Sequence, residues 1–174
     1  MSYESTATAP APSRARKFFG LIFGRGPFDG LADMPAWILG LVLLAPRIWL
    51  AIPFWDAGQI RLASFSRQPM FFQAIHPVPF LDPSTAAYLT TGAEIILPVL
   101  LVFGFFGRWA ALGLAVMAAT IFFIVGQTPQ GMQNGIAIAS EQFPWMFVGL
   151  ALFVIGPGRV SIDYGIRRLI LKDR

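Results

Sequence analysis

The stretch AAYLTTGAEIILPVLLVFGFFGRWAALGLAVM, residues 86–117, decides the fold class. It contains two long apolar runs separated by residues 104–108, and its first run carries a single charge, Glu94. A helix that crosses a bilayer needs about 20 mostly apolar residues. We therefore expect spans at about 84–106 and 109–125. The connection between them is so short that the two helices must be antiparallel neighbours.

Two further apolar segments extend this pattern. One covers about 36–60 and is interrupted by Arg47 and Asp56; the other covers about 139–155 and is short. The predicted fold class is all-α: an integral membrane antiparallel four-helix bundle over residues 35–157, with amphipathic interfacial helices at both termini. Pro46, Pro53 and Pro98 predict helices that are broken within the membrane.

The composition supports a membrane protein. Of 174 residues, 56% are hydrophobic and only 13% are charged, whereas soluble domains carry about 25% charged residues. The pI near 10.1 does not indicate a nucleic-acid partner, because the basic residues lie beside apolar runs. The lipid bilayer is the expected partner. With no cysteine and a single histidine, His76, the chain is expected to hold no haem, zinc or iron–sulfur site and no other metal.

The two ends of the chain differ from its centre. Residues 1–13 are rich in Ala, Pro, Ser and Thr and are expected to be disordered, and the basic, aromatic residues 14–34 are typical of an interfacial cytoplasmic segment. After residues 156–158, Gly-Pro-Gly, Ser161 can cap a new helix, and residues 158–174 form an expected cytoplasmic amphipathic tail.

The distribution of basic residues predicts the orientation. Ten of the 13 Lys and Arg residues precede the first span, lie at 104–108 or follow the last span, whereas one opposite loop holds Arg61 and Arg67 and the other holds none. An excess of Lys and Arg marks the cytoplasmic side. Both termini are therefore expected in the cytoplasm. The aromatic loop at about 62–83, which contains His76, is expected to lie on the opposite end of the bundle as a lid.

Glu94 is the most informative single position, because an ionisable group in the hydrocarbon normally faces the bundle interior with a partner. Counting residues from the ends of the spans places Arg47 nearer to Glu94 than Arg61, and predicts a Glu94–Arg47 pair or hydrogen-bonded network in the membrane. Arg61 is the alternative partner, because its long side chain reaches Glu94 if the first span starts deeper. Asp56 and Gln59 lie on the same helix as Arg61 and can extend the network. Two interpretations stay open. The network either fixes helix register as a packing contact, or it lines a cavity for a proton, a quinone or a small solute.

Three stretches resemble a known family of small bacterial four-helix membrane proteins, the DoxX family. They are RIWLAIPFWDAGQIR at 47–61, the stretch 86–117, and GPGRVSID at 156–163. The resemblance implies family-type polar positions at Arg47, Arg61 and Glu94, although a lysine is common at position 61. It also implies family-type structural positions, which are Gly58, Gly107, Arg108, Gly156, Gly158, Ser161 and Asp163.

The resemblance implies an accessory subunit of a quinone-linked redox system in the bacterial inner membrane. It places the chain in a homo-oligomer or a larger membrane complex, with quinone as a possible ligand. The prolines and buried charges also suit a small-solute transporter or permeation accessory, and the basic ends suit a scaffold that recruits a soluble enzyme. The residues leave open whether the chain is an enzyme, and they identify no catalytic residue.

Overall fold

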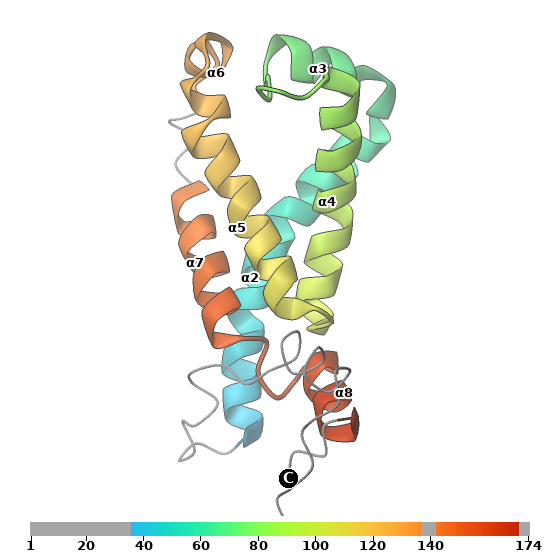
Figure 1. The fold of residues 1–174 in the computed structure, drawn as a ribbon, viewed down its shortest axis with the longest axis vertical. Helices are drawn as coiled ribbons and strands as arrows, with labels where there is room; N and C mark the ends of the chain where they lie inside the picture. The colour runs from blue at the N-terminus through green and yellow to red at the C-terminus, as the bar shows by residue number, and fades with distance from the viewer. Residues whose placement is uncertain (1–35, 137–141, 171–174) are drawn as a thin grey trace, which may run out of the picture.

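The computed structural model describes residues 36–136 and 142–170 (Figure 1), and within these ranges all regular structure is helical. Four longer helices form the body: α2 (Ala36–Ala63), α4 (Pro83–Phe103), α5 (Gly107–Phe123) and α7 (Gln142–Ile155). The shorter elements are η1 (Phe65–Arg67), α3 (Gln68–Ala74), η2 (Val125–Gln127), α6 (Pro129–Gln133) and α8 (Ile162–Ile170). The predicted segments 1–13 and 14–34 lie outside the described residues.

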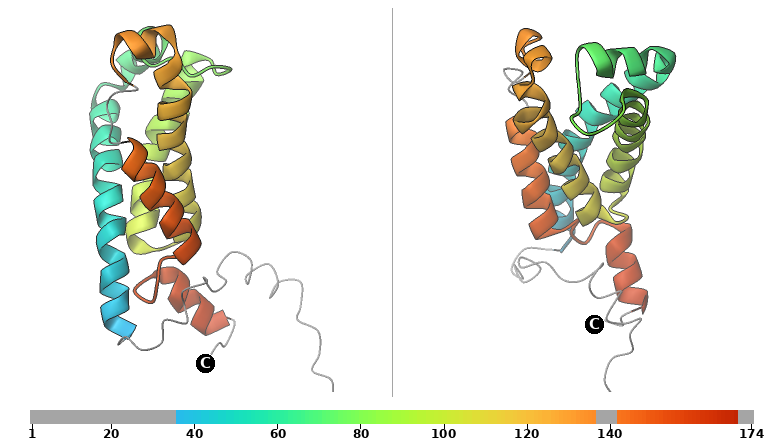
Figure 2. Two further views of the ribbon diagram at one scale, coloured as in Figure 1. Left: turned by 90° about the vertical axis from the view of Figure 1, so that its left-hand side faces the viewer. Right: turned by 45° about the horizontal axis from the view of Figure 1, so that its top comes forward.

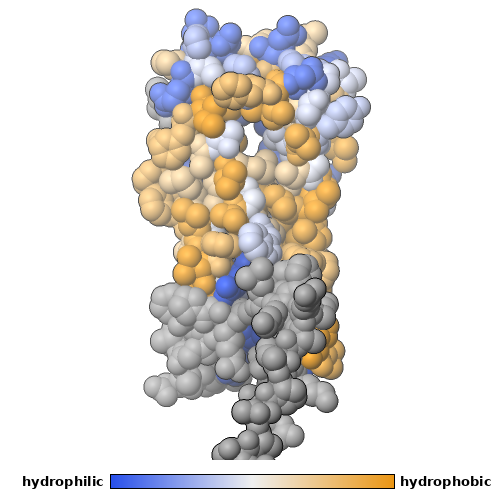
Figure 3. All heavy atoms as spheres, in the orientation of Figure 1, coloured by the Kyte–Doolittle hydropathy of each residue, from blue (hydrophilic) through white to orange (hydrophobic). Residues whose placement is uncertain are grey.

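Three segments are long and apolar enough to cross a membrane: Gly40–Ala63, Pro83–Phe103 and Gly107–Gln127. This confirms the expectation of helices of membrane-spanning length for these three. Helix α7 is apolar but has only 14 residues, and the residues just before it, 137–141, lie outside the described part. Apolar side chains also cover the middle of the face seen in Figure 3, while polar side chains gather near its upper end.

The helices pack as neighbouring pairs (Figure 2). Helix α5 lies against α7 and α4, and α4 also lies against α2 and α3, whereas α2 touches α7 only lightly. Small residues bring α5 and α7 together: a Cβ atom at Gly149 would come within 2.9 Å of both the Ala111 carbonyl oxygen and the Ala115 Cβ. Close backbone approach of this kind drives helix association in lipid, where apolarity alone does not.

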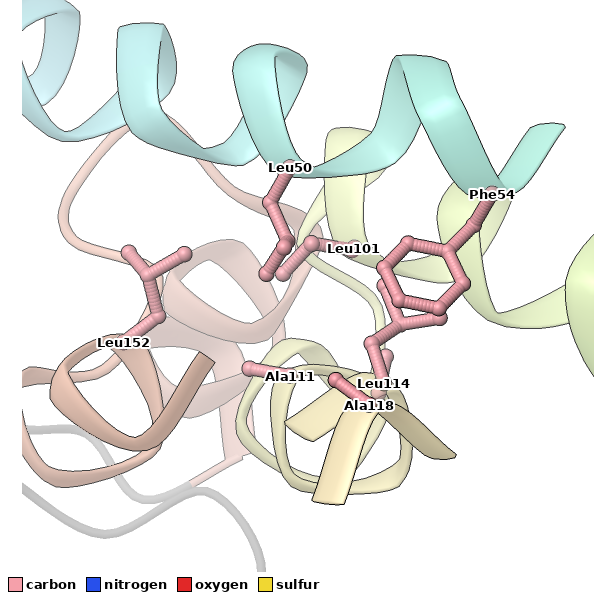
Figure 4. Packing of buried hydrophobic residues seen from close by; sticks show 8 residues of the cluster. Leu50, Phe54, Leu101, Ala111, Leu114, Ala118 and Leu152 are labelled. Atoms are coloured by element: carbon pink, nitrogen blue, oxygen red, sulfur yellow. The ribbon is translucent and has the colours of Figure 1, made fainter. Parts of the chain in front are cut away.

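The core is an apolar layer between these helices (Figure 4). Leu50 and Phe54 of α2 point toward Leu101 of α4 and Leu114 of α5. Leu152 of α7 joins the same buried cluster. Above and below this layer, toward the two ends of the bundle, lie the polar contacts described below.

The prolines do not break the helices. Pro46 and Pro53 lie inside the continuous helix α2, and Pro98 lies inside the continuous helix α4. The prediction of broken helices is therefore wrong. A proline removes one backbone donor, but neighbouring helices pack around each position and the helical path continues.

The end of the bundle that carries α8 is tied together by an acidic cap. The connection from α4 to α5 needs left-handed backbone at Gly104 (φ 63°) and at Phe106 (φ 50°). The Asp163 carboxylate accepts hydrogen bonds from the backbone N–H groups of Phe106 and Gly107, both at 2.8 Å. The side chain that caps α5 therefore comes from α8, so this connection and α8 hold each other in place.

The start of α8 follows the prediction made for Ser161. Its hydroxyl oxygen accepts a hydrogen bond from the Tyr164 N–H at 3.2 Å and donates one to the Gly158 carbonyl at 2.7 Å. Ile162, Leu169 and Ile170 of α8 are exposed.

Candidate functional site

Glu94 pairs with Arg61. The Arg61 Nε lies 2.8 Å from Glu94 Oε2, and the two side chains are 14% and 3% exposed. The predicted pair between Glu94 and Arg47 is wrong. Gly58 of α2 lies against the backbone of Glu94. Arg61 follows Gly58 by nearly one helical turn and is level with the carboxylate, whereas Arg47 precedes Gly58 by about three turns.

The close approach of α2 to α4 explains this register. A Cβ atom at Gly58 would come within 3.0 Å of both the Glu94 carbonyl carbon and the Glu94 Cβ, and within 2.9 Å of Ile95. Only a residue without a side chain fits at this crossing. The family-type glycine at position 58 therefore sets the distance across which Arg61 reaches Glu94.

Arg47 has a structural place at the α8 end of the bundle. It is fully buried, and its guanidinium donates to three carbonyl oxygens: Leu43 at 3.2 Å, Val102 at 3.4 Å and Val160 at 2.7 Å. These carbonyls belong to α2, to α4 and to the segment before α8. A planar guanidinium has five donors and can therefore bind three acceptors at once. Arg47 thus connects α2, α4 and the segment before α8, and it does not pair with Glu94.

Asp56 is not part of the polar pair either. Its side chain is exposed on α2, and no hydrogen bond or ion pair joins it to another described residue. Of the predicted network, the structure brings together only Arg61 and Glu94. The error arose because counting residues gives the level of a side chain but not the helix face that it occupies.

Helix α3 covers the Arg61 side of the pair, as the prediction of a lid over the bundle implies. The Arg61 guanidinium carbon lies 5.0 Å from the centre of the Phe72 ring and 5.4 Å from that of Phe71. Both rings also contact the His76 ring, at centroid distances of 5.8 Å for Phe71 and 5.9 Å for Phe72. Phe72 is buried against Ala86 and Ala87 of α4.

Several buried polar atoms in this region have no hydrogen-bond partner among the described residues. They are Arg61 Nη1, Gln68 Oε1, His76 Nδ1 and Thr91 Oγ1. Thr91 precedes Glu94 by three residues in α4 and so lies on the same helix face. A buried polar atom without a partner costs about 1–3 kcal/mol. We name Arg61, Gln68, His76, Thr91 and Glu94, together with Phe71 and Phe72, the α3-end site.

His76 is held neutral in this site. Burial, and then the positive charge of Arg61, lower the pKa of His76 from 6.5 to about 4. A neutral imidazole offers one donor and one acceptor. From the sequence, His76 is expected only as a loop residue, and neither Thr91 nor Gln68 is distinguished. The available signal was the aromatic character of the loop, with Phe71 and Phe72 four or five residues before the histidine.

The remaining family-type positions lie at the α8 end. Gly107 packs against Pro157, Gly156 (φ 90°) against Arg108, and Gly158 (φ 73°) against Leu43. Together with the caps formed by Ser161 and Asp163, these contacts fix the α4–α5 connection against the chain entering α8. They describe a structural element rather than a ligand site.

Residues 36–136 and 142–170 contain no group of three side chains suited to hold a metal ion. The α3-end site instead combines one acid, one base, uncharged polar groups and two phenyl rings. Since the charges of Arg61 and Glu94 offset each other, the arrangement suits an uncharged polar molecule better than an ion.

Comparison with known proteins gives one relative and one family. An uncharacterized protein of Haemophilus influenzae is 28% identical over 138 residues, which cover 75% of this chain and 86% of that protein. No solved structure gives a significant match. The DoxX family matches residues 42–127, a segment that contains α4, α5 and both members of the Arg61–Glu94 pair. The chain is a membrane protein of the DoxX family.

Proposed function

We propose that this chain is a small accessory subunit of a quinone-linked redox system and that the α3-end site binds a quinone headgroup. The observation that carries the proposal is the set of buried, unpartnered polar atoms around the Arg61–Glu94 pair, beneath the rings of Phe71 and Phe72. A quinone supplies a carrier of two electrons and two protons, and the protein supplies binding and orientation.

The donors and acceptors of the site match both forms of such a ligand. Arg61 Nη1 and the Thr91 hydroxyl are unpartnered groups that can donate to a quinone carbonyl. The Glu94 carboxylate, which already pairs with Arg61 through Oε2, has further lone pairs that can accept from the hydroxyl of the reduced form. Buried polar sites select ligands by leaving no group unpaired, so a ring with an oxygen at each end fits better than an apolar molecule.

We further propose that the protein lies in the bacterial inner membrane as a bundle of four antiparallel helices, with α7 as the fourth. Both termini would face the cytoplasm and the α3-end site would lie toward the opposite side. The bias of Lys and Arg toward the α8 end supports this orientation. The exposed apolar side chains of α8 support contact of that helix with the membrane surface.

Calorimetric titration of the purified protein in lipid nanodiscs with a short-tailed benzoquinone tests the proposal. We expect saturable binding that Thr91→Val weakens roughly five- to tenfold, because one hydrogen bond to a neutral group contributes about 1 kcal/mol. Thr90→Val is the matched control: Thr90 is the neighbouring threonine on another face of α4, and we expect it to leave the affinity unchanged.

Equal affinities for the wild type and Thr91→Val would contradict this placement of the ligand, and absence of saturable binding would contradict the function. A transporter would instead show solute flux in proteoliposomes. The continuity of α2 and α4 through their prolines removes one of the two features that favoured transport and leaves the buried charges. If the protein neither bound quinone nor carried solute flux, a scaffold that recruits a soluble enzyme would be supported.

A further inference from the structure

Helix α2 carries two polar side chains on its outward face. Ile52, Asp56, Gln59 and Ile60 are all exposed. Successive residues are rotated by about 100° around the helix axis. Around this axis Asp56 lies about 40° to one side of Ile52, and Gln59 lies about 20° to the other side. Arg61, which faces Glu94, lies on the opposite side of the helix. Asp56 and Gln59 therefore point away from the α3-end site and from the rest of the bundle.

These two side chains are level with the middle of the bundle. Gly58 packs against the backbone of Glu94, and Glu94 lies eleven residues after Pro83 and nine before Phe103 in α4. At 1.5 Å per residue this places Glu94 roughly 15 Å from either end of a helix of membrane-spanning length. Asp56 and Gln59 are within two residues of Gly58, so they lie beside Glu94 in depth, although α2 itself ends at Ala63, seven residues after Asp56 and four after Gln59.

An exposed carboxylate at this depth requires a partner. Neither Asp56 nor Gln59 has a hydrogen bond or an ion pair with any other described residue, although both lie among exposed apolar side chains such as Ile52 and Trp55. A carboxylate at the centre of a bilayer costs a few kcal/mol. Exposed apolar side chains are stable in contact with lipid. The two polar side chains are not, so they indicate that another molecule covers this face.

We propose that a second copy of this chain covers the face, with α2 against α2 about a two-fold axis. The two polar side chains are complementary: Gln59 carries amide donors, and Asp56, three residues earlier, carries carboxylate acceptors. In a two-fold pair each Gln59 donates to the Asp56 of the second copy, so one contact occurs twice. Hydrogen bonds between polar side chains are a main source of helix association in membranes.

Because the chain contains no cysteine, single cysteines report this contact directly. Ile52→Cys places a thiol at the centre of the face. Val116→Cys is the matched control, because Val116 is exposed at mid-length on α5. After treatment of native membranes with a membrane-permeant copper–phenanthroline oxidant, we expect a disulfide-linked dimer from Ile52→Cys and none from Val116→Cys.

A second set of variants separates polar pairing from chance collision. In the Ile52→Cys background, Asp56→Leu combined with Gln59→Leu should abolish the cross-linked dimer, whereas Asp56→Asn should retain it, since an amide oxygen still accepts from Gln59. A dimer that persists with both leucines, no dimer from Ile52→Cys, or a cross-link to a different protein would overturn the proposal. None of these residues belongs to the α3-end site, so quinone binding succeeds or fails independently.

Discussion

At the scale of single residues, the buried ion pair explains why Arg61 and Glu94 depend on each other. Each side chain is held inside a span, and each offsets the charge of the other across 2.8 Å. Removing one member of a buried pair leaves an uncompensated charge, which costs about 3–5 kcal/mol. Removing both charges leaves only polar side chains of similar size.

This predicts a strong coupling between two substitutions. Arg61→Gln and Glu94→Gln should each lower the melting temperature of the purified protein, and the variant with both substitutions should melt above either one. Thermal unfolding in detergent, followed by circular dichroism, measures the cycle. Additive losses would mean that the two side chains do not interact.

His76 gives the site a dependence on pH. Its pKa is about 4 in the folded protein and near 6.5 when exposed, so a proton binds more tightly once α3 opens. Opening is therefore unaffected above about pH 6.5 and becomes increasingly favourable as the pH falls from 6.5 toward 4. The protection factors of residues 68–76, which compare hydrogen exchange with the rate of an unfolded chain at the same pH, should therefore fall over this window.

The matched variant for this prediction is His76→Asn, which keeps a polar side chain but does not titrate. The difference in exchange between the wild type and His76→Asn isolates the histidine from the other ionisable groups of the site. An equal fall of the protection factors in both proteins would show that His76 is not responsible.

Glu94 could be found from the sequence because it is the single charge in an apolar run. The sequence offered two arginines as its partner, Arg47 and Arg61, and favoured the wrong one. Which arginine reaches it depends on how closely α2 approaches α4, and Gly58 sets that distance. Thr91 gave no signal at all, because a threonine in a span is unremarkable until its hydroxyl is found without a partner.

At the scale of the elements, α8 and the α4–α5 connection form one unit through Asp163. Burial raises the pKa of Asp163, while the two N–H groups that it caps and the nearby Arg108 and Arg47 act in the opposite direction. Asp163→Ala should cost about 1–2 kcal/mol, as loss of a helix cap does. Faster hydrogen exchange of residues 104–110 measures this loss.

Asp82→Ala is the control for this prediction. Asp82 caps α4 in the same way, accepting from the Thr85 N–H at 2.9 Å, but it lies at the α3 end. Its loss should loosen the first turn of α4 and leave residues 104–110 unchanged. If both variants loosened the same residues, Asp163 would not act as a local cap.

The three helices of membrane-spanning length followed from hydropathy, since 20-residue apolar runs have few alternatives to membrane helices. The continuity of α2 and α4 through their prolines did not follow. Whether a proline breaks a helix depends on what packs around it. The link between Asp163 and α5 joins residues more than 50 positions apart and leaves no local pattern.

For the molecule as a whole we expect one topology, with both termini in the cytoplasm and the α3 end of the bundle on the opposite side of the membrane. The chain has no cysteine, so Ser66→Cys and Asn134→Cys, both at exposed positions, should react with an impermeant maleimide added outside intact cells. Leu169→Cys on α8 should react only after permeabilisation. Two spans, α4 and α5, lie between positions 66 and 134. Labelling of these positions from opposite sides of the membrane would therefore contradict the topology.

The central claim is that a ligand binds between α3 and α4 beside the Arg61–Glu94 pair, and photolabelling with an azidoquinone tests it most directly. After irradiation of membranes that contain the protein, mass spectrometry locates the labelled peptides. We expect label in residues 68–76 and 86–97. Excess unmodified quinone and the substitution Thr91→Val should both reduce it. Label elsewhere on the chain, or label that excess quinone leaves unchanged, would contradict it.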